Sequence, residues 1–201
     1  MLIAVAELAA AAQKLEADHG LTALEGGRHR GLGTANRIVP LGDAYLELVA
    51  VADATEATGS FFGRWVGSGE IPRLLGWCVR THELDAVAER LSLGIEAGSR
   101  TRPDGTEVRW RMSGLEEASN EPSLPFFIEW GQGTPYPGSA PVEHRAGEAT
   151  IEELRLEGDP HRIQRWLGGA RLPIAVSEGP PALRSLLLSG EAGQIVLDYS
   201  R

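Results

Sequence analysis

Cysteine and lysine are scarce in this sequence, which contains one of each among 201 residues. A single cysteine, Cys78, excludes an internal disulfide bond and any metal site built from several thiolates. We expect its thiol to be buried and unreactive, because its neighbours along the chain are apolar. Since Lys14 is the one lysine, arginine carries almost all of the positive charge.

Positive charge is also in deficit overall. The chain has 28 acidic against 19 basic residues, which gives a net charge of −9. Binding to nucleic-acid phosphates requires a basic patch, so this balance argues against DNA or RNA as a partner. One short cluster of arginines stands out, and its members are Arg100, Arg102, Arg109 and Arg111. We interpret them as solvated, with the alternative that one of them contacts an anionic group of a substrate.

Long apolar runs are missing as well. No run approaches the roughly 20 residues that cross a bilayer, so we expect neither a membrane span nor a membrane partner. The first 20 residues lack a basic segment, and Glu7 and Lys14 interrupt their apolar stretch, which argues against a signal peptide. We therefore expect a cytoplasmic protein. The length suits one domain, or two small modules that share a core.

One pattern of apolar residues occurs twice. Leu8, Ala11, Ala12 and Leu15 are spaced as on one face of a helix, and WCVRTHELDAVAERL repeats them at an offset of 76 positions, beginning at Leu84. A strand-like run precedes each helix, and a glycine-containing turn and further strands follow it. We infer that one βαββ(β) unit is present twice.

Between the two helices, the runs TANRIVPL and AYLELVAV flank Gly42-Asp43, which is typical of a β-hairpin. We predict that LEGGRHRGLG, just before them, is a loop. Near the C-terminus, TIEELRLEG indicates a strand, and Asp159-Pro160 indicates a helix start with aspartate as its N-cap. Short strands are expected around residues 174–176, 185–188 and 194–198.

These patterns predict the domain organisation. We expect a first module over residues 1–70, a second over 71–137, a linker over 138–148 and a third, partial α/β unit (βαββ) over 149–201.

The segment GGRHRGLGTANRIVPLGDAYLELVAV, together with GWCVRTHELDAV, VRWRMSG and PFFIEW, resembles the glyoxalase-like branch of the vicinal oxygen chelate superfamily. The resemblance covers roughly residues 1–137 well and the third unit more loosely. It implies an α+β fold in which paired βαβββ modules form a curved, half-open barrel around a cleft. In metal-using members, His and Glu side chains on the first and last strands of each module hold a divalent ion that binds two substrate oxygens.

Two glutamates match the family's ligand positions. Alternation along AYLELVAV places Tyr45, Glu47 and Val49 on one face of the strand, while Glu129 shares a face with Phe127. The resemblance implies that Glu47 and Glu129 are metal ligands in the cleft, with Glu129 also a candidate catalytic acid or base. The alternative is that each glutamate faces solvent or pairs with an arginine.

The family's histidines do not match. The first-strand histidine precedes the Glu/Asp-Leu pair that opens the helix by seven positions. Counting back from Glu7 leads to the position before Met1, and counting back from Glu83 leads to Gly76. Either the natural chain begins further upstream, or this ligand is missing. His29 is the nearest replacement as ligand or catalytic base, and the alternative is an exposed loop histidine.

Four further residues are candidates for ligand binding: Asn36, Trp77, Arg80 and Trp110. The indoles could line an apolar pocket or simply pack in the core. Arg80 and Arg109 could bind a carboxylate, although surface exposure is the simpler expectation. Asn36 could bond a ligand or the backbone.

Because neither of the family's two histidine positions holds a histidine in the given sequence, we rank metal-independent binding of a small organic molecule first. A divalent-metal-dependent lyase, isomerase or dioxygenase comes second, and a non-catalytic interaction module third. The sequence leaves open whether the protein is an enzyme, whether it holds a divalent metal, and whether its modules are swapped in a homodimer.

Overall fold

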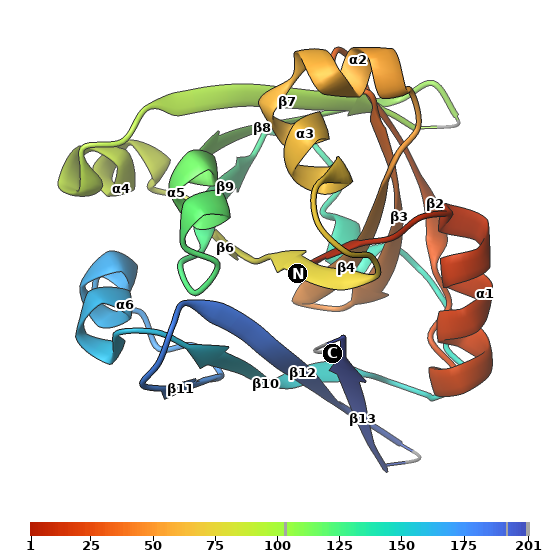
Figure 1. Cartoon of the computed structure of the whole chain (residues 1–201). Coiled ribbons are helices and arrows are strands. Elements are labelled where there is room, and N and C mark those ends of the chain that lie inside the picture. The colour runs from red at the N-terminus through yellow and green to blue at the C-terminus, as the bar shows by residue number, and fades with distance from the viewer. Residues whose placement is uncertain (103, 192, 200–201) are drawn as a thin grey trace.

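The computed structural model describes residues 1–102, 104–191 and 193–199, which form a nine-stranded sheet and a separate four-stranded sheet. In Figure 1 the larger sheet curves through the upper part of the molecule, with residues 54–59 at its top and residues 61–67 descending in front of it, and the smaller sheet lies below. No helix in these described ranges is both long and apolar enough to cross a membrane.

Residues 1–51 form a βαβββ module. Its elements are β1 (Leu2–Ala4), α1 (Leu8–His19), β2 (Leu24–His29), β3 (Thr34–Leu41) and β4 (Ala44–Val51). Gly42, at a φ of 73°, and Asp43 form the tight turn between β3 and β4, as the sequence predicts. β1 lies parallel to β4, with Leu2 opposite Glu47, so the strand order is β1-β4-β3-β2.

The second module repeats this arrangement. Its elements are β6 (Cys78–Arg80), α4 (Leu84–Leu91), β7 (Ile95–Thr101), β8 (Glu107–Ser113), α5 (Leu115–Asn120) and β9 (Phe126–Trp130). Here too the first strand lies parallel to the last, and the order is β6-β9-β8-β7. Ala12 of α1 and Ala88 of α4, which are 76 positions apart, are both buried. The internal repeat therefore reflects two copies of one fold unit.

The joined modules curl into a nearly closed barrel. Their sheets meet where Arg28 of β2 pairs with Thr101 of β7. The connection between them contains α2 (Ala54–Gly59), α3 (Phe61–Gly67) and β5 (Arg73–Gly76), and β5 adds to the edge of β1. Since only Trp77 separates β5 from β6, the two edge strands of the sheet are neighbours in sequence.

Alternating residues of the barrel strands belong to two cores. The inner core contains Leu2, Val49, Phe126 and Ile128, with Phe62 of α3 and Leu115 of α5 packed among them. The outer core takes the intervening residues, among them Ile3, Leu46, Leu48 and Phe127. An outward-facing side chain of the first module therefore packs in the layer shared with α1 and the second sheet, whereas much of the outer face of β7 and β8 is exposed.

The third unit covers part of the outer face. It consists of β10 (Thr150–Glu157), α6 (Pro160–Leu167), β11 (Ile174–Ser177), β12 (Ala182–Gly190) and β13 (Gly193–Asp198), in the strand order β11-β10-β12-β13. The Asp159 side chain accepts hydrogen bonds from the first turn of α6, as its N-cap pattern predicts. Trp166 Nε1 donates to Pro125 O at 2.8 Å, and Arg90 donates to the last carbonyls of α6. These bonds attach the unit to the second module.

One sequence prediction is wrong. LEGGRHRGLG was expected to be a loop, yet its first half is β2, and His29 at the strand end is buried. Glycine disfavours strands in general, but Gly26 is needed here because an added Cβ would lie 2.0 Å from Asn36 Oδ1 on β3. The close approach of β2 and β3 therefore explains why Gly26 occurs in a strand, although glycine in this segment favoured a loop in the sequence.

Candidate functional site

The barrel interior holds a small, mainly apolar cavity into whose lining several polar side chains are set. Its volume is about 50 Å³. Polar and aromatic side chains from five strands line it, namely His29 on β2, Asn36 on β3, Glu47 on β4, Arg100 on β7 and Trp110 on β8. A few convergent polar groups in an otherwise apolar interior are a feature of ligand sites, and this cavity shares that feature while being far smaller than the several hundred Å³ usual for such sites.

Three of these side chains form a connected group. Asn36 Nδ2 donates to Glu47 Oε1 at 2.8 Å and faces His29 Nε2 at 3.4 Å. His29 Nδ1 lies 2.8 Å from Thr34 Oγ1, and Nε2 lies 3.8 Å from Glu47 Oε1. Because an amide N–H faces Nε2, we assign the ring proton to Nδ1, which donates to Thr34. The unprotonated Nε2 then points toward Glu47.

Burial keeps the His29 ring neutral. It lowers the pKa of His29 below the ordinary value of 6.5, and Glu47 only partly opposes this effect. As the pH falls through that ordinary value, the unfolded chain takes up a proton that the folded chain resists. Stability linked to His29 is therefore present above this pH and is lost on acidification.

We expect the native protein to lose more free energy of unfolding than His29→Gln between about pH 7.5 and about pH 5. Urea unfolding at both pH values measures the difference, and comparison with the variant removes the contribution of the other four histidines. An equal loss in both proteins would show that His29 is not held neutral by burial.

Arg100 is the unusual member of the cavity. Its side chain is only 5% exposed, and Nη1 has no hydrogen-bond partner among the described residues. Burial lowers the pKa of Arg100, and Glu47 acts against this without forming a direct ion pair with the guanidinium. Two neighbouring groups, Asn36 Oδ1 and Trp130 Nε1, are also buried without a partner. The residues that line the cavity thus include two donors that no described protein group uses, on Arg100 and Trp130, whereas Asn36 Oδ1 packs against Gly26 of β2.

A glycine on β7 shapes the aromatic wall. A Cβ at Gly98 would lie 2.4 Å from Nε1 of Trp110, so the indole lies directly against the strand backbone. Trp110 is then held beside His29 and Trp130, with ring-centroid distances of 6.1 and 5.7 Å. The two indole rings therefore lie beside the polar group.

A second, much larger cavity of about 1230 Å³ lies between the barrel and the four-stranded sheet. The β3–β4 hairpin, β6, the connector around the 3-10 helix η1 (Pro137–Ser139) and strands of the third unit line it. Tyr45, Ile128 and Trp130 line both cavities, so these side chains form a shared wall.

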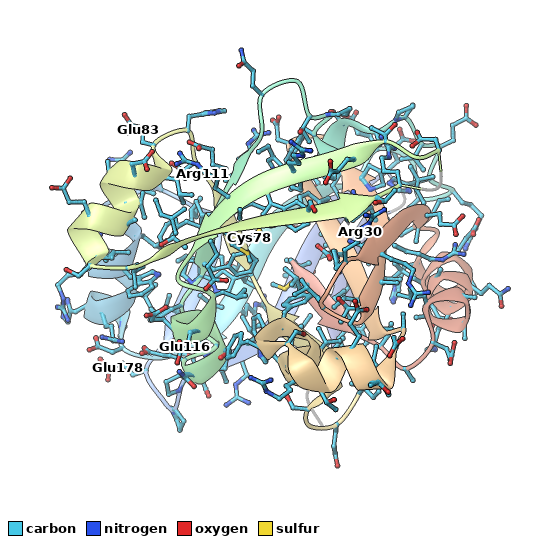
Figure 2. The ribbon with its side chains drawn as sticks, turned by 90° about the horizontal axis from the view of Figure 1, so that it is seen from above. Arg30, Cys78, Glu83, Arg111, Glu116 and Glu178 are labelled. Atoms are coloured by element: carbon cyan, nitrogen blue, oxygen red, sulfur yellow. The ribbon has the colours of Figure 1, made fainter. Side chains whose placement is uncertain are left out.

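The structure does not bring the two candidate glutamates together. Glu47 lies in the barrel interior, whereas Glu129 alternates with the inward-facing Ile128 and therefore lies on the outer face of β9. There Glu129 accepts hydrogen bonds from Arg111, which also binds Asp85 of α4. Figure 2 shows Arg111 at the α4 side of the molecule, while Cys78 lies near the centre.

The other candidates also separate. Asn36 and Trp110 lie in the small cavity, but Trp77 packs in the outer core with Nε1 donating to Ser123 O. Arg80 lies over the Tyr136 ring at 4.2 Å, on the lining of the larger cavity.

Arg109 is exposed and paired with Glu107. The buried cation is Arg100, which the sequence grouped with three exposed or half-buried arginines. The sequence did not distinguish Arg100 from the other arginines of this cluster, one of which was expected to contact an anionic group of a substrate.

Burial raises the pKa of the Cys78 thiol, which keeps it protonated.

A divalent metal, as the family implies, does not fit this donor set. Within the described ranges, no three His, Cys, Asp or Glu side chains are grouped so that they could hold an ion. The Arg100 guanidinium shares the cavity with Glu47 and would repel a cation. At Gly76, a Cβ would lie 2.7 Å from the Trp65 ring, so α3 fills the place of the expected ligand.

We therefore expect Mg²⁺, Mn²⁺, Ni²⁺ and Zn²⁺ to leave the Tm of EDTA-treated protein unchanged, because an ion that binds only the folded state would raise it. Differential scanning fluorimetry measures this, with Glu47→Gln as the matched variant. A rise in Tm that this variant abolishes would contradict the interpretation.

Comparisons with known proteins agree with the fold. A solved structure described as a hypothetical protein from Staphylococcus aureus is 14% identical and matches with a TM-score of 0.73 over 94% of this chain and 89% of its own. At this identity the likeness shows the fold alone. The methylmalonyl-CoA epimerase of Mycobacterium tuberculosis is 18% identical over 64% of this chain and 83% of its own, with a TM-score of 0.45. That of Streptomyces coelicolor is 16% identical over 66% and 94%, with a TM-score of 0.46.

The two epimerase matches are too weak to bear on function. No curated protein matches the chain. The family model described as a glyoxalase-like domain matches residues 1–171, which include both βαβββ modules and the first strand and helix of the third unit. The chain therefore belongs to the glyoxalase-like domain family.

Proposed function

We propose that this protein binds a small organic acid in the barrel interior without a metal ion, with the carboxylate of the acid against Arg100. The observation that carries the proposal is the buried Arg100 guanidinium, whose Nη1 lacks a protein partner. A buried charge that lacks a hydrogen-bonded partner lowers the free energy of unfolding by an amount on the order of several kcal/mol. A carboxylate would remove that cost.

The surrounding groups support the same ligand class. Trp130 Nε1 is a second donor without a partner among the described residues. Glu47 already accepts a hydrogen bond from Asn36, which moderates its repulsion of a second carboxylate. Planar carboxylates suit arginine because its N–H groups form two parallel hydrogen bonds.

The proposal is tested by titrating metal-free protein with lactate, pyruvate and phenylacetate, each against its amide, by isothermal titration calorimetry. We expect heat and saturation with the acids and none with the neutral amides, because the amides are nearly isosteric but lack the charge. A cavity of about 50 Å³ also has room for water. If water alone satisfies Arg100, neither set binds, and the proposal fails.

A second candidate function is proton transfer to or from the bound molecule. It is favoured by the neutral His29, whose Nε2 carries no proton in the assigned tautomer and lies close to both Asn36 Nδ2 and Glu47. A base of this kind could remove a proton from a ligand held on Arg100. NMR in D₂O measures exchange of the C3 protons of pyruvate or of the C2 protons of phenylacetate. We expect exchange with the native protein and none with His29→Gln if this function is present.

A further inference from the structure

The larger cavity is the least explained feature of the molecule. Its volume of about 1230 Å³ exceeds what a small acid needs. Apolar side chains from the barrel and from the third unit line much of it, including Leu41, Trp77, Val79, Leu154, Ile174 and Leu186. An apolar space of this size beside a charged cavity suggests a ligand with two chemically different ends.

The two cavities share part of their lining. Tyr45, Ile128 and Trp130 line both, and in the connector Pro137 lines the inner cavity while Tyr136 lines the outer one. Phe62 of α3 and Leu115 of α5 also line the inner cavity. Both lie on helices outside the sheet and pack in the inner core of the barrel. The outer cavity therefore adjoins the inner one along the Tyr45 and Trp130 wall.

Several polar groups of the outer cavity are already engaged within the protein. His144 uses both ring nitrogens on the backbone, since Thr22 N donates to Nδ1 at 3.0 Å and Nε2 donates to Pro40 O at 2.7 Å. Arg80 is engaged over the Tyr136 ring. Three carboxylates also contribute to the lining: Asp43, Glu143 and Glu148. This lining disfavours a second negative charge on the ligand.

We propose that the outer cavity takes the apolar body of the ligand whose carboxylate binds Arg100, so that the ligand class is an amphipathic monocarboxylic acid with a long or bulky apolar part. This inference rests on the proposed function, because it uses the same acid head group. It adds the role of the third unit, whose β10, β11 and β12 supply one wall of the outer cavity.

The test uses straight-chain acids of increasing length, namely butyrate, octanoate and decanoate, with decanol as the neutral control. Each is titrated into the native full-length protein by isothermal titration calorimetry. We expect affinity to rise about threefold to fourfold per methylene, because a buried CH₂ contributes about 0.8 kcal/mol. Decanol should bind at least tenfold more weakly than decanoate, because it lacks the charge that Arg100 binds (roughly a factor of ten per 1.4 kcal/mol).

Two matched variants locate the apolar part. Ala140 lines only the outer cavity, so Ala140→Trp should fill space there and weaken decanoate binding by about tenfold or more while leaving butyrate unaffected. Ala170, after α6, is exposed and lines neither cavity, and Ala170→Trp should change nothing. Thermal unfolding of both variants checks that they are folded.

The outcomes separate the two proposals. If butyrate and decanoate bind equally and Ala140→Trp has no effect, the outer cavity does not hold the ligand, and this inference is overturned while the proposed function stands. If decanol binds as tightly as decanoate, the outer cavity is a general apolar site, and the inferred ligand class is wrong. If no acid binds, the proposed function fails and this inference fails with it.

Discussion

Replacing Arg100 with methionine is expected to weaken octanoate binding by about 30-fold or more. Methionine keeps much of the length of the side chain but removes the charge and every donor. Truncating one partner of a buried, charged hydrogen bond costs about 2–5 kcal/mol, because the other charge is left without a partner. Isothermal titration calorimetry with native protein and variant measures the effect directly.

The matched control is Arg109→Met. Arg109 belongs to the same sequence cluster, but its side chain is 72% exposed and pairs with Glu107. We expect octanoate binding to remain unchanged in this variant, since exposed ion pairs contribute little. If both variants bind octanoate like the native protein, Arg100 is not the anchor, and the ligand must be held elsewhere.

Gly26→Ala is expected to lower the free energy of unfolding by about 1–3 kcal/mol, the usual cost of forcing extra atoms into a packed site. The added Cβ would lie 2.0 Å from Asn36 Oδ1 and 2.8 Å from the Asn36 carbonyl oxygen. One of these contacts involves backbone, so moving the side chain alone cannot relieve the overlap. The displaced Asn36 would also lose its hydrogen bond to Glu47.

Gly94→Ala provides the control for this prediction. No atom lies within 4 Å of a Cβ built at Gly94, and its φ is not in the left-handed region. Urea unfolding of the three proteins should show a lower midpoint for Gly26→Ala alone. Equal midpoints for both variants would show that the β2–β3 contact tolerates a side chain and that Asn36 is not tightly held.

Much of the barrel could be predicted from the sequence because its signals are local. The helical spacing that repeats between Leu8 and Leu84 reflects two helices that each pack against a sheet. The Gly42-Asp43 turn and the alternation in β4 depend only on backbone geometry and on neighbouring residues. These features therefore do not depend on contacts with distant parts of the chain.

The side of the sheet that each residue faces was harder to predict. Alternation correctly grouped Glu129 with Phe127, but alternation alone cannot say which face of β9 becomes the interior. That depends on the direction in which the whole sheet curls. Glu129 consequently lies outside with Arg111, although the family resemblance placed it in the cleft.

The identity of the buried arginine also depends on tertiary structure. Arg100 lies on β7, where most residues are exposed or half-buried, and it becomes enclosed only because β7 joins β2 across the modules. Counting from Glu83 found Gly76 at the expected ligand position but gave no hint that Trp65 fills the space beside it. Contacts between segments far apart in sequence leave no periodic signal.

The comparison that tests the central claim most directly is a titration of EDTA-treated protein with octanoate and with octanamide. The two probes differ in charge and hardly in shape. We predict that octanoate binds at one site per chain and that octanamide binds at least tenfold more weakly, roughly the factor that 1.4 kcal/mol represents. Equal affinity for the two, or binding of octanoate only when a divalent metal is restored, would contradict a metal-independent acid site on Arg100.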